Sequence, residues 1–215
     1  MFEDRKDAGQ KLALALGKYK DQDVIVLGIP RGGVEVGYYV AKFLHVRFSM
    51  VISRKLPLPH DPEAGFGAIS EDGSTFMIER AAQWVSGEEI EEIKQVQRRE
   101  IARRIQMLRK GRPLSDLKGK TVILVDDGIA MGVTMRAAIQ LCGRKKAGKV
   151  VVAAPVAGED VAKEIAETVD ELVVLETPVF FHAVAQAYRH WYDVPDKEVL
   201  AIMDRWEKEE ALRRA

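Results

Sequence analysis

The sequence lacks several features that would narrow its class at once. It contains no asparagine, one cysteine (Cys142) and no net charge, because 33 lysines and arginines balance 33 aspartates and glutamates. One cysteine excludes an intrachain disulfide, and its apolar helical setting favours inert burial over catalysis. Zero net charge argues against nonspecific nucleic-acid binding, which needs a basic footprint, but it does not exclude a locally positive pocket.

Long hydrophobic runs are also missing. No apolar stretch approaches the length of a membrane span, and the charged segment from Glu3 to Asp7 is unlike a signal peptide. We therefore expect a cytoplasmic protein that binds neither membranes nor nucleic acids. The 215 residues, 47% hydrophobic and 31% charged, suit one globular domain over residues 1–215.

Short apolar runs alternate with helical patterns along most of the chain. We predict strands at 24–27, 47–53, 121–125, 149–155 and 171–175, and helices at 8–20, 34–44, 133–141 and 160–168. Strands that alternate with helices indicate an α/β fold: a mostly parallel, five-stranded, Rossmann-like sheet with helices on both faces. This core would comprise about 8–55 and 118–177.

Two segments lie outside that pattern. Residues 56–67 hold three prolines and two glycines without a period, so we expect a mobile loop. Short runs at 66–69 and 75–78 predict a hairpin, and Ser86 with Glu89 forms a capping box for a helix ending near Lys110. With segment 178–215, whose final helix begins near Pro195, the insertion at 56–117 would form a small hood.

The segment from Val122 to Thr134 carries the most specific chemistry. Four apolar residues deliver Asp126 and Asp127 to the carboxyl end of a strand, where open α/β sheets bind ligands. A loop of small residues follows, and a helix beginning near Val133 offers unpaired N–H groups that favour a phosphate dianion. Carboxylates suit sugar hydroxyls or a metal ion, so the pattern predicts a ribose 5-phosphate site.

This segment resembles the phosphoribosyl pyrophosphate signature of type I phosphoribosyltransferases: apolar strand, two acids, short loop, glycine, threonine. The resemblance implies that Asp126 and Asp127 are catalytic, binding the ribose hydroxyls and Mg²⁺, the metal directly or through water. It implies that the 5-phosphate is held, largely through backbone N–H groups, by Ala130, Met131, Gly132, Val133 and Thr134.

Two residues of this loop depart from patterns in the family. Met131 stands where the family usually has threonine, so one hydrogen-bond donor to the phosphate is lost. Ala130 stands where members that act on 6-oxopurines carry an aspartate, which counts against a hypoxanthine-guanine enzyme.

Two further clusters become informative beside residues 126–134, which we call the acidic loop. The turn from Gly28 to Gly33, on its own an ordinary strand-to-helix turn, resembles the family's pyrophosphate loop. The resemblance implies a non-prolyl cis bond at Pro30-Arg31, and pyrophosphate binding by Arg31, Gly32 and Gly33. We place Arg54 and Lys55 at the end of the second strand, where they can hold the pyrophosphate leaving group, with Arg31 and Lys55 as catalytic residues.

Two parts of the chain would cover the site. The segment after Lys55 resembles the family's flexible closing loop and carries three candidate general bases, namely His60, Asp61 and Glu63. Aromatic residues cluster between Phe180 and Tyr192, and packing explains most of them. The resemblance implies a hood in which Phe180 or Phe181 stacks on the base.

We therefore expect a cytoplasmic, homodimeric glycosyltransferase of the phosphoribosyltransferase type, acting in nucleotide metabolism. With Mg²⁺ it would move ribose 5-phosphate from phosphoribosyl pyrophosphate to a nitrogenous, purine-like acceptor. The closest likeness is to members whose acceptor is unassigned. One alternative is a non-catalytic sensor of nucleotides or phosphoribosyl pyrophosphate, which Met131 keeps open. Another is a phosphatase or hydrolase using the paired acids, which the turn at 132–134 fits poorly.

Overall fold

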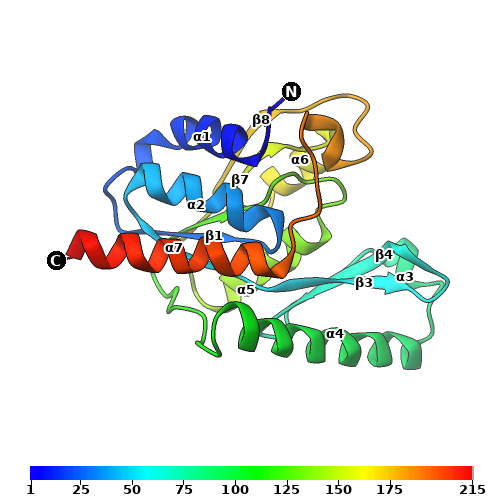
Figure 1. Cartoon of the computed structure of the whole chain (residues 1–215). Coiled ribbons are helices and arrows are strands. Elements are labelled where there is room, and N and C mark those ends of the chain that lie inside the picture. The colour runs from blue at the N-terminus through cyan, green and yellow to red at the C-terminus, as the bar shows by residue number, and fades with distance from the viewer. Residues whose placement is uncertain (215) are drawn as a thin grey trace.

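The structure is a computed structural model (Figure 1). Its central sheet has five parallel strands in the order β2-β1-β6-β7-β8. The structure describes residues 1–214, apart from the side chains of Pro62, Glu63 and Arg214. The strands are β1 (Val24–Gly28), β2 (Arg47–Met50), β6 (Thr121–Val125), β7 (Lys149–Val156) and β8 (Glu171–Glu176). Because every pairing is parallel, the carboxyl ends of the strands meet at one edge. The predicted α/β fold is confirmed.

Helices cover both faces of this sheet. One face carries α1 (Arg5–Ala15), η1 (Gly17–Tyr19), α2 (Gly32–Leu44) and α7 (Asp196–Arg214), and the other carries α5 (Val133–Arg144) and α6 (Glu159–Ala166). Val24 and Val26 pack with the first group, whereas Ile25 and Leu27 pack with the second. Consecutive residues of β1 thus face opposite helical layers, which is why the strand is apolar throughout.

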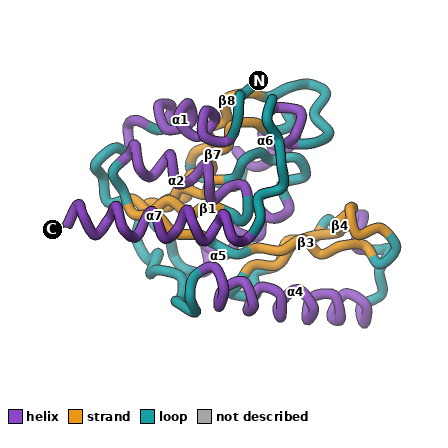
Figure 2. Tube along the Cα trace, viewed as in Figure 1, coloured by secondary structure: helices purple, strands orange, loops and turns teal. Residues whose placement is uncertain are grey.

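A second, antiparallel sheet extends from the core as an arm (Figure 2). It consists of β3 (Ser53–Leu58), β4 (Asp61–Ser70) and β5 (Thr75–Met77), and is followed by α3 (Glu79–Ala82) and α4 (Gly87–Leu108). The predicted hairpin is β4–β5, with Ala68 opposite Phe76. The predicted capping box is also present, because Ser86 Oγ accepts from Glu89 N at 3.2 Å and Glu89 Oε2 accepts from Ser86 N at 2.9 Å.

Two predicted boundaries in this region are wrong. The strand expected at 47–53 ends at Met50, and Ser53 begins β3 in the other sheet. The loop expected at 56–67 is instead largely the β3–β4 hairpin, with Leu56 opposite Gly67 and Pro57 opposite Gly65. Proline fits here because β3 is an edge strand, and the register shifts on both sides of Pro57.

The C-terminal segment returns to the N-terminus before α7 begins. It contains η2 (Val184–Ala187), and Tyr188 forms a β-bridge with Phe2. The helix expected from Pro195 is α7, which starts one residue later. Among residues 1–214, no helix combines the length and apolar character needed to cross a bilayer.

Candidate active site

Two loops lie side by side at the carboxyl edge of the sheet. β1 and β6 are neighbours with Gly28 opposite Val125, and Ile29 N donates to Val125 O at 2.8 Å. A Cβ added to Gly33 would lie 2.8 Å from Asp126 Cα, so the turn after β1 packs directly on the acidic loop. The peptide bond Pro30-Arg31 is cis, as expected.

The acidic loop is fastened to the end of β7. Ile129 N donates to Val156 O at 2.9 Å, and Gly158 N donates to Ile129 O at 3.2 Å. Gly132 then adopts a φ of +70°, and α5 begins at Val133 as predicted. A positive φ is costly for residues other than glycine, so this position is suited to the sharp entry into the helix.

A pocket of about 230 Å³ lies over this loop. Its walls come from the arm, the acidic loop, the start of α5 and the C-terminal segment: Lys55, Asp126, Gly128, Ile129, Ala130, Met131, Gly132, Val133, Thr134, Met135 and Val184. The first-turn N–H groups of a helix attract anions, and Lys55 adds a positive charge. A carboxylate, a helix N-terminus and an ammonium group therefore share one small cavity.

The two adjacent acids have different surroundings. Asp126 lines the pocket, whereas Asp127 is 9% exposed and accepts a hydrogen bond at Oδ2 from Arg5 Nε at 2.8 Å. Tyr188 Oη also donates to the main-chain oxygen of Asp127 at 2.5 Å. The acidic pair is thus divided into one side chain at the cavity and one held by a buried cation.

Burial raises the pKa of both carboxyl groups, and the rise is larger at Asp126 because the charge of Asp127 adds to it. Arg5 opposes the rise at Asp127. The guanidinium of Arg5 therefore favours the charged form of Asp127 over its neutral form.

Sequence comparison agrees with this geometry. The family described as the phosphoribosyl transferase domain matches residues 3–189.

The chain belongs to this family.

It is 40% identical over 207 residues to "Putative phosphoribosyl transferase MT0597" and "Putative phosphoribosyl transferase Rv0571c" of Mycobacterium tuberculosis strains CDC 1551 and H37Rv. These matches cover 95% of this chain but 47% of each relative, so the chain spans about half their length. It is also similar to the crystal structure of TT1426 from Thermus thermophilus, with a TM-score of 0.80 and 36% identity. That match covers 95% of this chain and 98% of the other.

Among the basic residues that the sequence predicts for the site, Lys55 alone lines this pocket. Arg31 precedes α2, with its Nη1 3.9 Å from Asp196 Oδ1. Arg54 turns towards α4, where its Nε donates to Gln97 Oε1 at 3.0 Å. The placement of Arg54 and Lys55 at the end of the second core strand is wrong, because both belong to β3 of the arm.

The residues expected to cover the site also take different places. Phe180 is 83% exposed and, with Phe181, lines a separate pocket beside Met1 and Glu176. His60 lies in the β3–β4 turn and Asp61 begins β4. Neither borders the acidic-loop pocket, and the side chain of Glu63 lies outside the described residues.

Val184 and Arg5 are site residues that the sequence does not mark. A Cβ on Gly128 would lie 2.5 Å from Val184 Cγ1, so Val184 closes the pocket over the loop. Both residues come from segments near the chain ends, and no motif accompanies them. An apolar position shortly after Phe181 could have suggested Val184, but no local pattern points to Arg5.

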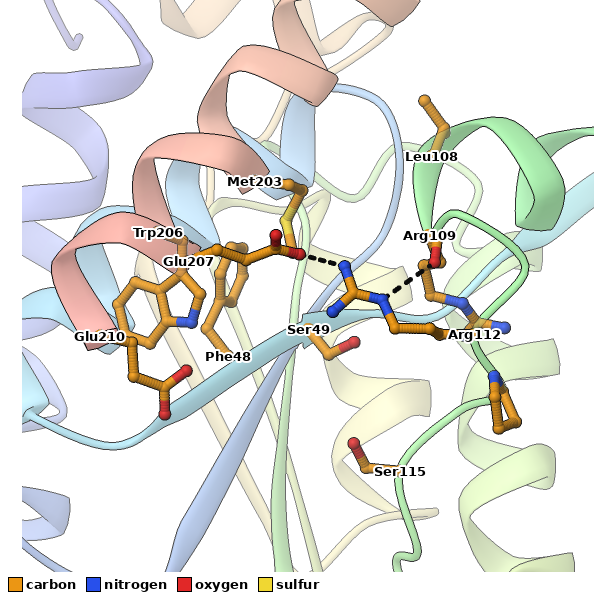
Figure 3. Close-up of a pocket in the computed structure, with 11 residues that line it drawn as sticks. Phe48, Ser49, Leu108, Arg109, Arg112, Ser115, Met203, Trp206, Glu207 and Glu210 are labelled. Atoms are coloured by element: carbon orange, nitrogen blue, oxygen red, sulfur yellow. Dashed lines mark hydrogen bonds and ion pairs between the residues drawn. The ribbon is translucent and has the colours of Figure 1, made fainter. Parts of the chain in front are cut away.

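A further pocket, near the end of β2, has a different character (Figure 3). Arg112 crosses it, ion-paired with Glu207 of α7, and its Nε donates to the main-chain oxygen of Arg109 at 3.3 Å (Figure 3). The charge of Arg112 is therefore met from within the chain. This contact ties the segment after α4 to α7.

Proposed function

We propose that this protein transfers ribose 5-phosphate from phosphoribosyl pyrophosphate to a nitrogenous acceptor and releases pyrophosphate. The observation that carries the proposal is the convergence of Asp126, the N-terminus of α5 and Lys55 on one pocket. A sugar 5-phosphate needs an anion site next to acceptors for its ring hydroxyls, and the N-terminus of α5 with Lys55 would supply the first and Asp126 the second. Membership of the phosphoribosyl transferase family supports the same reaction class.

Different residues would bind the three parts of the substrate: the 5-phosphate, the ribose hydroxyls and the pyrophosphate. The 5-phosphate would accept from N–H groups of residues 130–134, with the hydroxyl of Thr134 as an added donor. The ribose hydroxyls would donate to Asp126. The pyrophosphate would lie against Gly32, Gly33 and Arg31, with Lys55 and Arg54 approaching from the arm. Asp127 would not touch the substrate, because its carboxylate is paired with Arg5 outside the pocket.

The acidic loop also suits Mg²⁺. Within the described residues, no group of three or more His, Cys, Asp or Glu side chains could hold a metal ion unaided. Magnesium in phosphate enzymes is commonly bound by one or two carboxylates together with substrate oxygens, which is what Asp126 and the sugar would offer. We propose that Asp126 holds the ion directly or through water. When bound, the ion neutralises charge on the leaving group.

The chemical step follows from these roles. The bond between the anomeric carbon and the pyrophosphate oxygen breaks, and the electron pair leaves with pyrophosphate. A nitrogen lone pair of the acceptor attacks the opposite face of the sugar. Positive charge grows on the ribose in between, and the carboxylates of the acidic loop stabilise it. Lys55 and Arg31 stabilise the departing negative charge.

A second candidate is a sensor that binds the sugar without turnover. Met131 supports this candidate. Its side chain is 48% exposed and lines the pocket, but a thioether cannot donate the hydrogen bond to the 5-phosphate that the family's usual threonine would donate. A purine-like acceptor, a homodimer, a cytoplasmic location and a role in nucleotide metabolism are further proposals. The acceptor proposal rests on the family resemblance of the aromatic segment at 180–192 alone, because Phe180 and Phe181 line another pocket.

Two measurements test the proposal. Calorimetry with phosphoribosyl pyrophosphate and Mg²⁺ should show binding, and Asp126→Asn combined with Asp127→Asn should abolish it without unfolding the protein. Asp160→Asn, which changes an exposed acid of α6, is the matched control and should bind normally. Pyrophosphate release with a panel of nitrogenous bases then separates enzyme from sensor. Wild-type protein that fails to bind the sugar would refute both.

A further inference from the structure

Arg5 has a setting that is unusual for an arginine. Its side chain is 3% exposed, although arginine is seldom buried unless its charge is met. Nε donates to Asp127 Oδ2 at 2.8 Å and Nη1 donates to Tyr192 O at 3.0 Å. The guanidinium carbon also lies 4.0 Å from the centroid of the Trp191 ring, within cation–π range. Three kinds of contact therefore hold this one cation in place.

The pair formed by Arg5 and Asp127 also packs on the turn expected to bind pyrophosphate. A Cβ on Gly32 would overlap Asp127 Oδ2 and would lie 2.8 Å from Arg5 Nε. The pair therefore fills the space beside Gly32, while the neighbouring residue Asp126 lines the cavity. One buried ion pair thus packs on the turn at Gly32 and also adjoins, through the sequence neighbour Asp126, the acidic-loop pocket.

We infer that Arg5 is a positioning residue for the ribose site, an inference that rests on the proposed function. Arg5 keeps the carboxylate of Asp127 turned towards Gly32 and supplies its counter-charge. Asp126 then faces the pocket as the acid that receives the ribose hydroxyls. Without Arg5, the carboxylate of Asp127 loses its buried partner, and nothing of comparable charge keeps it turned towards Gly32 and away from the space of Asp126.

Substitutions at Arg5 test this role. Arg5→Met removes the charge and keeps much of the apolar length, so we expect the affinity for phosphoribosyl pyrophosphate with Mg²⁺ to fall roughly 10–100-fold, the usual effect of losing a partner that orients a ligand-binding group. Arg5→Lys keeps the charge without the planar fork and should restore part of the affinity. Arg189→Met is the matched control, because exposed Arg189 joins the same two chain segments through Glu3. It should bind like wild type.

A double-mutant cycle shows whether Arg5 acts through Asp127. If it does, Arg5→Met combined with Asp127→Asn should bind the sugar no more weakly than Asp127→Asn alone. Losses that add would overturn the inference, and so would unchanged affinity in both Arg5 variants. Should Arg5→Met fail to fold by circular dichroism, Arg5→Lys alone and combined with Asp127→Asn supplies the cycle. Wild-type protein that binds no sugar refutes the proposed function, whereas binding that ignores Arg5 refutes this inference only.

Discussion

At the scale of single residues, Gly32 shows how tightly the site is built. Its α-carbon faces a buried ion pair, and a methyl group there would overlap Asp127 Oδ2. Neither partner has room to retreat, because Asp127 is 9% and Arg5 3% exposed. The backbone of the turn after β1 can therefore approach the acidic loop only where a side chain is missing.

We expect Gly32→Ala to impair both stability and binding. Overpacking a tight site costs about 1–3 kcal/mol, and here it also separates Arg5 from Asp127. Urea unfolding would measure the first effect and calorimetry with phosphoribosyl pyrophosphate the second. Gly143→Ala is the control, since a Cβ there meets nothing within 4 Å. Normal sugar affinity in Gly32→Ala would contradict the close packing described for this turn.

The same scale shows what the sequence can predict of the site and what it cannot. Asp126, Gly132 and Thr134 belong to one contiguous strand–loop–helix segment, so their chemistry is visible in sequence order. Arg5 meets Asp127 across 122 residues of chain, and Val184 reaches Gly128 from the C-terminal segment. Tertiary packing alone creates these contacts, and no local periodicity encodes them.

At the scale of elements, the arm was the part hardest to predict. The core strands are runs of apolar residues with clear turns between them, and that pattern locates all five. β3 and β4 instead contain prolines and glycines, which usually indicate loops. Here Gly65 makes room for the side chain of Lys55, and Gly67 lets Phe76 O approach closely. Residues that break a sheet elsewhere allow this narrow hairpin to close.

The arm is anchored to the core by a buried ion pair. Glu71, at the β4–β5 turn, pairs with both terminal nitrogens of Arg109, which follows α4. Arg109 Nη1 also donates to Met50 O at 3.2 Å, and Glu71 Oε1 accepts from Ile52 N at 3.0 Å. The pair therefore joins the arm, the end of α4 and the chain after β2.

Breaking this anchor should be costly. We expect Arg109→Met to destabilise the protein by about 3–5 kcal/mol, because Glu71 is left as a buried, unpaired charge. Adding Glu71→Leu should recover a large part of that loss. Urea denaturation of the two single variants and the double variant measures the coupling. Arg112→Met, which removes an exposed cation nearby, is the control and should cost less. Single losses that simply add would show that the two side chains act independently.

At the scale of the whole molecule, Glu35 lies where several parts of the chain meet. Burial raises the pKa of this α2 side chain to about 7, while Arg5 of α1 opposes the rise and Glu198 of α7, Asp4 and Asp127 support it. Its Oε2 is buried and finds no hydrogen-bond partner among residues 1–214. The folded protein therefore binds a proton here that the unfolded chain releases near pH 4.5.

This difference sets a pH dependence of stability. Between about pH 4.5 and 7, the folded state binds more protons at Glu35 than the unfolded state, so the free energy of unfolding falls as the pH rises. Glu35→Gln removes this loss and should raise stability at pH 8 by about 1 kcal/mol after solvent screening, or roughly 2–4 °C in Tm. The gain should vanish near pH 4. Exposed Glu167→Gln serves as control, and a gain independent of pH would contradict the assignment.

The bridge between Phe2 and Tyr188, together with the bond from Arg5 to Tyr192, also bears on biosynthesis. A ribosome makes Arg5 before the acidic loop and the contacting residue Tyr192 after it, so a nascent chain carries the acidic loop before that loop has its full support. Chains that end before residue 192 would contain the family's signature segment at 122–134. They would lack Tyr192, whose main-chain oxygen accepts from Arg5 and so helps to hold Arg5 beside Asp127.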